Sequence, residues 1–218
     1  MIENIFGYPF YIEQIDIPTG FDKTIQKELA NLTFPATPEG WNCDVQTSKG
    51  TNGNHGKGKF SGPTWDKLHR LMQPHISAYM QPFLDSVIKE CKPQIRIGYW
   101  INKYEKGQWQ EEHTHAGWHV FLSGIMLLTD PDENSAVTSF HNPHKDAMQY
   151  MATLGVSTFN NPFFTQSILS ESLLLHLDKY CILLFPATVP HSVTTHQSDT
   201  PRFSLSFNYE INLLPLES

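Results

Sequence analysis

Three histidines and one arginine have the types and spacings to hold a metal ion beside an acidic ligand. His113 and His115 are separated by one residue, His191 lies much further along the chain, and Arg202 follows eleven residues after His191. Imidazole nitrogens bind divalent metals, and a guanidinium group can bind a carboxylate through two parallel N–H donors. The set predicts a mononuclear metal held in a β-barrel, with a basic anchor for an acidic organic ligand.

The histidine pair predicts a facial metal site if it lies on a strand. Residues two apart on a strand point to the same face, so His113 and His115 would converge, and His191 from a distant strand would complete the set. Open sites of this kind are typical of non-heme iron, which usually takes two histidines and one carboxylate, but imidazole also suits zinc, copper and nickel. Glu111 and Glu112 could supply a carboxylate, with a solvated turn as the alternative. Histidine pairs also occur on solvated strands, so the order of the whole set carries the prediction.

The arginine belongs to a predicted strand, residues 202–212, that has one polar and one apolar face. Arg202, Ser204 and Ser206 share the polar face. The apolar face carries three large side chains: Phe203, Leu205 and Phe207. The polar face either lines a cavity or faces solvent, and the residues alone leave both open.

The N-terminal region that precedes these motifs predicts a strand, a helix and a long loop. Residues 4–17 read as an entering strand, which Pro9 would place at a sheet edge because proline cannot donate a ladder hydrogen bond. Thr19 is the expected cap of a helix over residues 19–32. Residues 33–63 are rich in Gly, Pro, Asn, Thr and Ser, and they predict a loop that is functional or mobile.

A second helix and a series of strands complete the predicted fold. The helix covers residues 64–91, and Pro74 and Pro82 should break or kink it. Turn residues separate the later apolar segments, which favours a β-sandwich or jelly roll. We expect one α+β domain, with residues 1–92 as a helical cap packed on a barrel of residues 93–218. The predicted strands are 94–104, 113–129, 136–141, 172–177, 180–185, 189–195 and 202–212.

Length and charge exclude several classes of protein. A chain of 218 residues fits one domain with a substantial core. The net charge of −7 argues against a general nucleic-acid binder, and no apolar run approaches the ~20 residues that a membrane-spanning helix needs. The N-terminus has no secretory signal pattern. Three widely spaced cysteines fit a reduced compartment, so we expect a cytoplasmic protein.

These motifs together resemble the double-stranded β-helix (jelly-roll) dioxygenases that use Fe(II) and 2-oxoglutarate. The resemblance rests on Asn102-x-Tyr104, His113-x-His115, His191 and Arg202-x-Ser204. The segment from Tyr104 to His113 is similar to the entry of the prolyl-4-hydroxylase-like members into the metal motif. The chain is closer still to a group of 2-oxoglutarate/Fe(II) oxygenases of marine bacteria and their phages, through four further motifs: Leu122-Ser-Gly124, Phe140-His-Asn142-Pro143, Leu184-Phe-Pro186 and Arg202-Phe-Ser-Leu-Ser-Phe-Asn208.

The resemblance implies an enzyme that hydroxylates an unidentified protein, peptide or small molecule and releases succinate and CO2. It implies Fe(II) on His113, His115 and His191, with 2-oxoglutarate as cosubstrate. The cosubstrate's far carboxylate would pair with Arg202, and the implied hydrogen-bonding groups around it are Ser204, Asn102 and Tyr104, with Ser123 as a further candidate. If the chain is phage-encoded, the implied compartment is the host cytoplasm.

One position departs from the wider superfamily. His115 stands where those proteins have Asp or Glu, so a three-histidine site would carry one less negative charge.

The three tryptophans Trp100, Trp109 and Trp118 could line a pocket or pack in the core. Four other histidines are interpreted as polar lining or surface: His119, His141, His144 and His196.

Two other functions fit parts of the pattern. A cupin-type metalloenzyme that does not use 2-oxoglutarate would explain the spacing of Gly107, His113 and His115, but the glutamate of the cupin motif is missing, with His119 and Val120 at its place. A non-catalytic barrel that binds a ligand is the third hypothesis, and the intact set of ligands argues against it.

Overall fold

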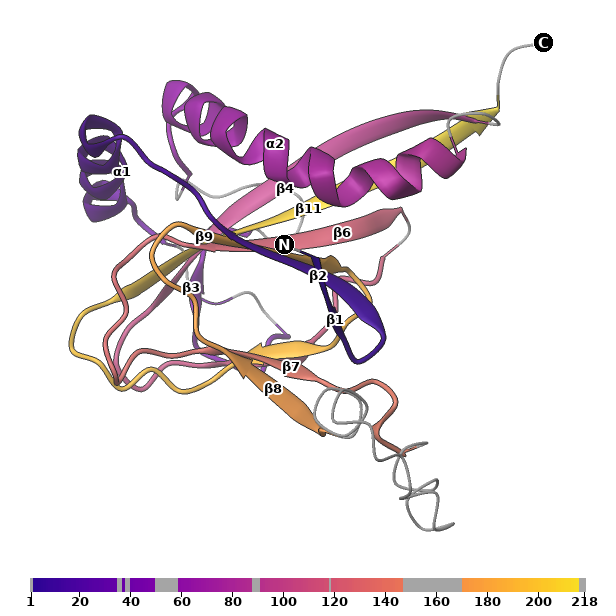
Figure 1. Ribbon diagram of the computed structural model, residues 1–218. Helices are drawn as coiled ribbons and strands as arrows, with labels where there is room; N and C mark the ends of the chain where they lie inside the picture. The colour runs from indigo at the N-terminus through magenta and orange to yellow at the C-terminus, as the bar shows by residue number, and fades with distance from the viewer. Residues whose placement is uncertain are drawn as a thin grey trace.

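The computed structural model describes residues 2–34, 37, 40–49, 59–87, 91–117, 119–146 and 170–215. These residues form two helices and eleven strands (Figure 1). The helices are α1 (Thr19–Asn31) and α2 (Gly62–Val87). The strands are β1 (Ile2–Ile5), β2 (Tyr8–Gln14), β3 (Gln46–Thr47), β4 (Cys91–Tyr104), β5 (Gln110–His113), β6 (Val120–Leu127), β7 (Thr138–His141), β8 (Ser172–Leu175), β9 (Cys181–Pro186), β10 (His191–Val193) and β11 (Arg202–Pro215).

The strands form two antiparallel sheets. The larger has the order β1-β2-β9-β6-β11-β4-β3, and the smaller has the order β5-β10-β7-β8. In Figure 1, α2 lies across one face of the larger sheet, and β7 and β8 lie on the opposite side. The expected α+β class is therefore correct at the level of mostly antiparallel sheet with two helices. Neither of the described helices is long and apolar enough to cross a membrane.

Alternation along the central strands directs side chains to two different cores. Leu122 and Met126 of β6 pack in one cluster with apolar residues of α1 and α2, whereas Ile125 and Leu127 pack in a second cluster with Phe140 of the smaller sheet. This is the two-residue period of a strand that is covered on both faces. The larger sheet is thus a central layer with the helices on one side and the smaller sheet on the other.

A single glycine permits close packing on the helix-facing side. Gly124 of β6 lies opposite Phe207 of β11. A Cβ atom at position 124 would lie 2.1 Å from the Phe207 ring, so only glycine leaves room for this ring. The ring belongs to the core cluster between the sheet and the helices.

The N-terminal prediction of one strand over residues 4–17 is wrong, because the segment forms a hairpin. β1 and β2 are joined at Phe6 and Gly7, and both residues have the positive φ that a tight two-residue hairpin turn requires. The strand that contains Pro9 is not the edge strand that was expected, because β2 lies between β1 and β9, although β9 pairs with it only from Tyr11 onward. The expected Thr19 cap is also wrong. The N-cap residue of α1 is Pro18, whose carbonyl accepts from two backbone N–H groups, and no side chain caps the helix.

Two other boundaries differ from the sequence-based expectation. α2 continues as one helix through Pro74 and Pro82, so the prolines do not break it, and the alternative of a kink stays a prediction. The single strand expected over residues 113–129 is divided into β5 and β6, with a loop between them that contains His115. Part of the loop expected over residues 33–63, including all of residues 50–58, lies outside the described residues, and β3 within the described part joins the edge of the larger sheet.

Candidate active site

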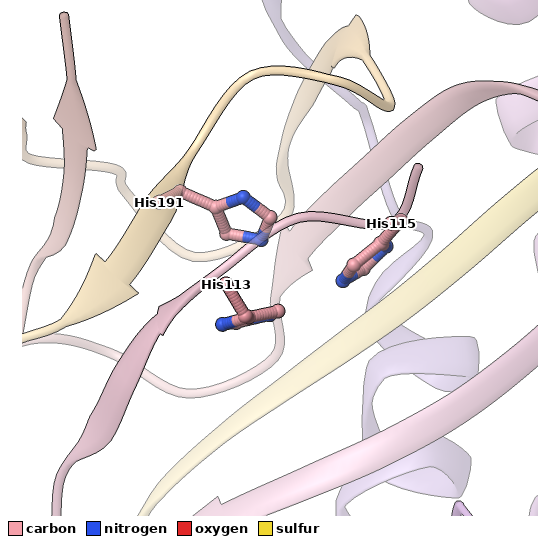
Figure 2. A group of neighbouring side chains, drawn as sticks. All are labelled: His113, His115 and His191. Atoms are coloured by element: carbon pink, nitrogen blue, oxygen red, sulfur yellow. The ribbon is translucent and has the colours of Figure 1, made fainter. Parts of the chain in front are cut away.

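Three histidine side chains converge between the two sheets (Figure 2). His113 ends β5 and lies directly opposite His191 at the start of β10, so the antiparallel register itself brings these two residues together. The ring centroids are 4.3 Å apart for His113 and His191, 5.0 Å for His115 and His191, and 5.2 Å for His113 and His115. One ring nitrogen from each residue lies within 4.8 Å of the others. Among the described residues, this is the one group of three or more His, Cys, Asp or Glu side chains that could hold a metal ion.

His115 reaches this cluster from a loop and not from a strand. The prediction that His113 and His115 share the face of one strand is therefore wrong, although the two imidazoles do meet. The His115 backbone N–H donates to the Ala187 carbonyl at 2.9 Å, which fixes the loop after β5. The ring is held by Asn208 of β11, whose Oδ1 accepts from His115 Nδ1 at 2.7 Å, and by the Ser123 hydroxyl at 3.0 Å.

All three rings are oriented by a hydrogen bond at Nδ1. His113 Nδ1 lies 2.8 Å from the Glu111 carbonyl and His191 Nδ1 lies 3.1 Å from the Val189 carbonyl. Because a carbonyl can only accept, Nδ1 must carry the proton in both rings, and the Asn208 oxygen selects the same tautomer of His115. Each Nε2 is then unprotonated and can bind a metal, an arrangement common for metal-ligating histidines.

Burial keeps these imidazoles neutral. Desolvation lowers the pKa of His113, lowers the pKa of His115 to about 3, and lowers the pKa of His191 well below its usual value. Each of His115 and His191 is also disfavoured as a cation by the neighbouring histidines. Neutral rings at neutral pH are what a divalent metal requires of histidine ligands. The donor set therefore fits a divalent metal.

A cavity of about 190 Å³ extends from the histidines toward Arg202. This space greatly exceeds the roughly 10–15 Å³ that a single water needs. Cross-strand pairing sets one wall, since Arg202 lies opposite Tyr104 and Ser204 lies opposite Asn102. All four of these predicted residues line the cavity.

Arg202 is a buried cation without an anionic partner among the described residues. Its side chain is 4% exposed, and its guanidinium carbon lies 5.1 Å from the centre of the Tyr104 ring. One nitrogen lies 3.4 Å from the Ser204 hydroxyl, while Nε has no hydrogen-bond partner in the described structure. Burial lowers the pKa of Arg202, which reflects the cost of holding its charge away from water.

Unpaired polar atoms concentrate in this cavity. The described structure contains four buried side-chain oxygen or nitrogen atoms without a hydrogen-bond partner, and all belong to cavity-lining residues. They are Asn102 Oδ1, Glu111 Oε2, Thr138 Oγ1 and Arg202 Nε. Buried polar atoms of proteins are normally paired, so these atoms indicate the place of a polar ligand.

The other residues predicted to bind the cosubstrate differ in which of their atoms face the cavity. The buried Tyr104 hydroxyl donates to Gln110 Oε1 at 2.6 Å, so its ring rather than its hydroxyl faces Arg202. The Asn102 amide nitrogen donates to Ser206 Oγ at 3.3 Å and leaves its oxygen unpaired. Ser123 contacts His115 and Asn208 and does not line the cavity.

Several other predictions about the site are corrected or completed. Trp100 lines the cavity, Trp109 is partly exposed away from it, and Trp118 lies outside the described residues. His196 is neither surface nor cavity lining. It is fully buried, its Nδ1 accepts from the Ala136 N–H, and its Nε2 donates to the Thr200 carbonyl. Glu111 lines the cavity but is not part of the metal-binding group.

Sequence reasoning assigned no role to several residues of the site, among them Lys49, Trp41, Gln110, Thr138 and Asn208. Lys49 and Trp41 line the cavity, but both belong to a segment without hydrophobic periodicity. Asn208 orients His115, and its place on the same face of β11 as Arg202 was the signal that could have found it.

The comparison with protein families decides the assignment. The family described as "Putative 2OG-Fe(II) oxygenase" matches residues 98–208, just over half of the chain. The chain belongs to this family. This oxygenase is therefore an enzyme, and its cofactors are Fe(II) and 2-oxoglutarate. The matched segment contains the three clustered histidines and Arg202. Among curated proteins, no sequence matches the chain significantly.

Solved structures share the fold at low sequence identity. A prolyl-4-hydroxylase of Pseudomonas putida superposes with a TM-score of 0.58 at 12% identity, covering 92% of this chain and 91% of that one. The α-ketoglutarate-dependent epimerase SnoN from nogalamycin biosynthesis gives 0.58 at 16% identity, with 96% and 81% covered. HygX of Streptomyces hygroscopicus, solved with nickel and 2-oxoglutarate, gives 0.54 at 12% identity, with 92% and 82% covered.

Proposed function

We propose that the oxygenase holds Fe(II) through Nε2 of His113, His115 and His191 and binds the far carboxylate of 2-oxoglutarate on Arg202. The observation that carries the proposal is the buried, unpaired guanidinium in the same cavity as three neutral imidazoles. A buried cation is costly unless an anion accompanies it, and a dicarboxylate cosubstrate supplies that anion. The planar fork of arginine suits bidentate pairing with a carboxylate.

The surrounding residues would orient this cosubstrate. The Tyr104 ring stacks beside the guanidinium and limits its movement. Ser204 and Asn102, opposite one another on β11 and β4, present a hydroxyl and an amide toward the cavity. Asn208 and Ser123 hold the His115 ring from behind. His113 and His191 lie on paired strands, and the contacts of the His115 ring with Asn208 and Ser123 restrain the third proposed ligand, which lies in a loop.

With Fe(II) bound, the chemistry supplied is the oxidative decarboxylation of 2-oxoglutarate to succinate and CO2, coupled to hydroxylation of a second substrate. The chain's own contribution is to hold the cosubstrate in one orientation and to keep the imidazoles deprotonated. Apolar residues of the inter-sheet cluster around His191, such as Phe140 and Phe185, exclude water from one side of the site. The second substrate is proposed to be a protein, a peptide or a small molecule.

The arrangement of the sheets supports a finer description of the fold. We propose that the two facing sheets are the halves of a double-stranded β-helix and that α1 and α2 form a helical cap on it. We further propose a single domain, in which residues 93–218 supply the catalytic core. β1, β2 and β3 come from the preceding region and extend the larger sheet. A cupin-type enzyme would leave Arg202 without a role, so this alternative receives no support.

Turnover of 2-oxoglutarate tests the proposal. Anaerobically purified protein is loaded with Fe(II), exposed to oxygen, and assayed for succinate with and without candidate substrates. We expect succinate from the wild type and none above background from His191→Ala. His144→Ala is the matched control, because His144 is an exposed histidine outside the cluster. Equal succinate formation in wild type and His191→Ala would contradict the proposal.

A further inference from the structure

A second cation, Lys49, lines the cavity in addition to Arg202. Lys49 follows β3, and the residue before it is fixed to β4. The Ser48 N–H donates to the Ile101 carbonyl at 2.9 Å, and the Ile101 N–H donates to Ser48 Oγ at 2.9 Å. These two bonds hold Lys49 beside the inner face of β4, where Trp100 also lines the cavity.

The Lys49 ammonium lies over the Trp100 ring and near the Trp41 ring, and it has no ion-pair partner among the described residues. Nζ lies 4.4 Å from the centre of the Trp100 ring and 6.0 Å from that of Trp41. No described carboxylate forms an ion pair with it, and burial lowers its pKa. Other lysines of the described structure do pair with carboxylates, as Lys106 with Asp199 and Lys179 with Asp22 and Asp130. The aromatic contacts stabilise the charge in part, but they leave its N–H donors free.

Lys49 and Arg202 lie toward different ends of the cavity. Arg202 is opposite Tyr104, whereas Lys49 contacts Trp100, four residues earlier on β4, which is about 13 Å along a strand. The Trp100 ring is 5.4 Å from the ring of His115. Lys49 therefore lies on the histidine side of the cavity, away from the anchor for the far carboxylate.

The charges in the cavity leave one cation unmatched. The two negative charges of 2-oxoglutarate equal the two positive charges of Fe(II), and the three histidines are neutral. Glu111, the remaining acidic residue that lines the cavity, can offset only one of Arg202 and Lys49. One positive charge therefore remains in the cavity.

We propose that Lys49 binds a carboxylate of the primary substrate, and that Trp41 and Trp100 flank the adjoining apolar part. This inference rests on the proposed function, because it takes the place of 2-oxoglutarate to be at Arg202. The carboxylate belongs either to a free organic acid or to the C-terminus of a peptide. Lys49 is thus a specificity-determining residue that selects acidic substrates.

The test compares 3-phenylpropanoate with its uncharged amide, 3-phenylpropanamide. Binding is followed through tryptophan fluorescence in protein loaded with Mn(II) and 2-oxoglutarate. We expect the acid to bind at least tenfold more tightly than the amide, and Lys49→Met to remove this preference. Lys59→Met is the matched control, because Lys59 also lies over an aromatic ring of β4, Tyr99 at 4.7 Å, but does not line this cavity. A preference that is absent in the wild type, or unchanged in Lys49→Met, overturns the inference.

Two further arms separate the alternatives. A heptapeptide that ends in phenylalanine, with a free or an amidated end, is compared with 3-phenylpropanoate, and the tighter acid identifies the source of the carboxylate. Affinity for 2-oxoglutarate is measured by calorimetry in parallel. We expect Lys49→Met to leave it within twofold of the wild type. A loss as large as that of Arg202→Met assigns Lys49 to the cosubstrate and overturns the inference, whereas absence of 2-oxoglutarate binding in the wild type contradicts the proposed function instead.

Discussion

Replacing Arg202 by methionine should separate affinity for 2-oxoglutarate from stability. The substitution keeps a long apolar side chain in contact with Tyr104 and removes the charge. In the wild type the guanidinium has five N–H donors, and within the described structure one nitrogen makes a single long contact with Ser204. Enough donors are therefore free for a two-bond fork to a carboxylate.

The expected loss follows from those two bonds. A hydrogen bond to a charged group contributes about 1.5–3 kcal/mol, so losing a fork of two should cost about 3 kcal/mol or more, a roughly hundredfold weaker affinity. Arg202→Lys should recover part of this, because an ammonium group supplies charge without the planar fork. In the absence of cosubstrate, Arg202→Met should be more stable than the wild type. Removing a buried, unpaired charge should stabilise the protein by about 1 kcal/mol, or about 2–4 °C in melting temperature for a chain of this size.

Calorimetry and thermal unfolding check the two halves of this prediction. 2-Oxoglutarate is titrated into Mn(II)-loaded wild type, Arg202→Met and Arg202→Lys, and the metal-loaded proteins are melted without cosubstrate. Arg96→Met on β4 is the control for loss of a positive charge, because Arg96 does not line the cavity. Equal affinities in wild type and Arg202→Met would refute the assignment of Arg202. A lower melting temperature for Arg202→Met would refute the argument that its charge is uncompensated.

Three further predictions concern the histidines. His191→Ala should bind less than a tenth of the iron that the wild type holds after dialysis, measured by atomic emission, with cooperative unfolding retained. His115→Ala should also lose iron, whereas His115→Asp should retain it, because a carboxylate restores the usual two-histidine, one-carboxylate set; iron retained in His115→Ala would place this ring outside the ligand set. Below about pH 6.5 the histidines of the unfolded state bind protons, whereas the buried rings of the folded state stay neutral. The metal-free protein should therefore lose stability as the pH falls. With a folded pKa of about 3, His115 alone should lower the free energy of unfolding by about 1.4 kcal/mol for each pH unit over that range. Urea unfolding of His115→Asn should therefore show a shallower dependence of stability on pH.

The shared face of Arg202 and Ser204 could be predicted from strand geometry, but only the family resemblance implied that this face lines a cavity with Asn102 and Tyr104. Arg202 and Ser204 share a face through the two-residue period, and the antiparallel register then places Tyr104 and Asn102 opposite them. The pairing of His191 with His113 could be predicted only in part. The sequence indicates two strands, but the register that sets them opposite each other depends on tertiary packing.

Other parts of the site depend on contacts that no local pattern records. His115 lies in a loop whose path is fixed by the Ala187 carbonyl and by Asn208, both distant in sequence. Lys49 occupies a segment without periodicity, and only its link through Ser48 to β4 brings it to the cavity. The hairpin at Phe6 was missed because a non-glycine residue adopts positive φ there, which sequence rules assign mainly to Gly, Asn and Asp.

A crystal structure of the oxygenase with Mn(II) and 2-oxoglutarate, grown without oxygen, tests the central claim most directly. The account predicts one metal ion with a ring nitrogen of His113, His115 and His191 each at about 2.0–2.3 Å, and the far carboxylate of 2-oxoglutarate on the Arg202 fork. A His115 nitrogen farther than roughly 2.5 Å from the metal, or a far carboxylate bound away from Arg202, would contradict it.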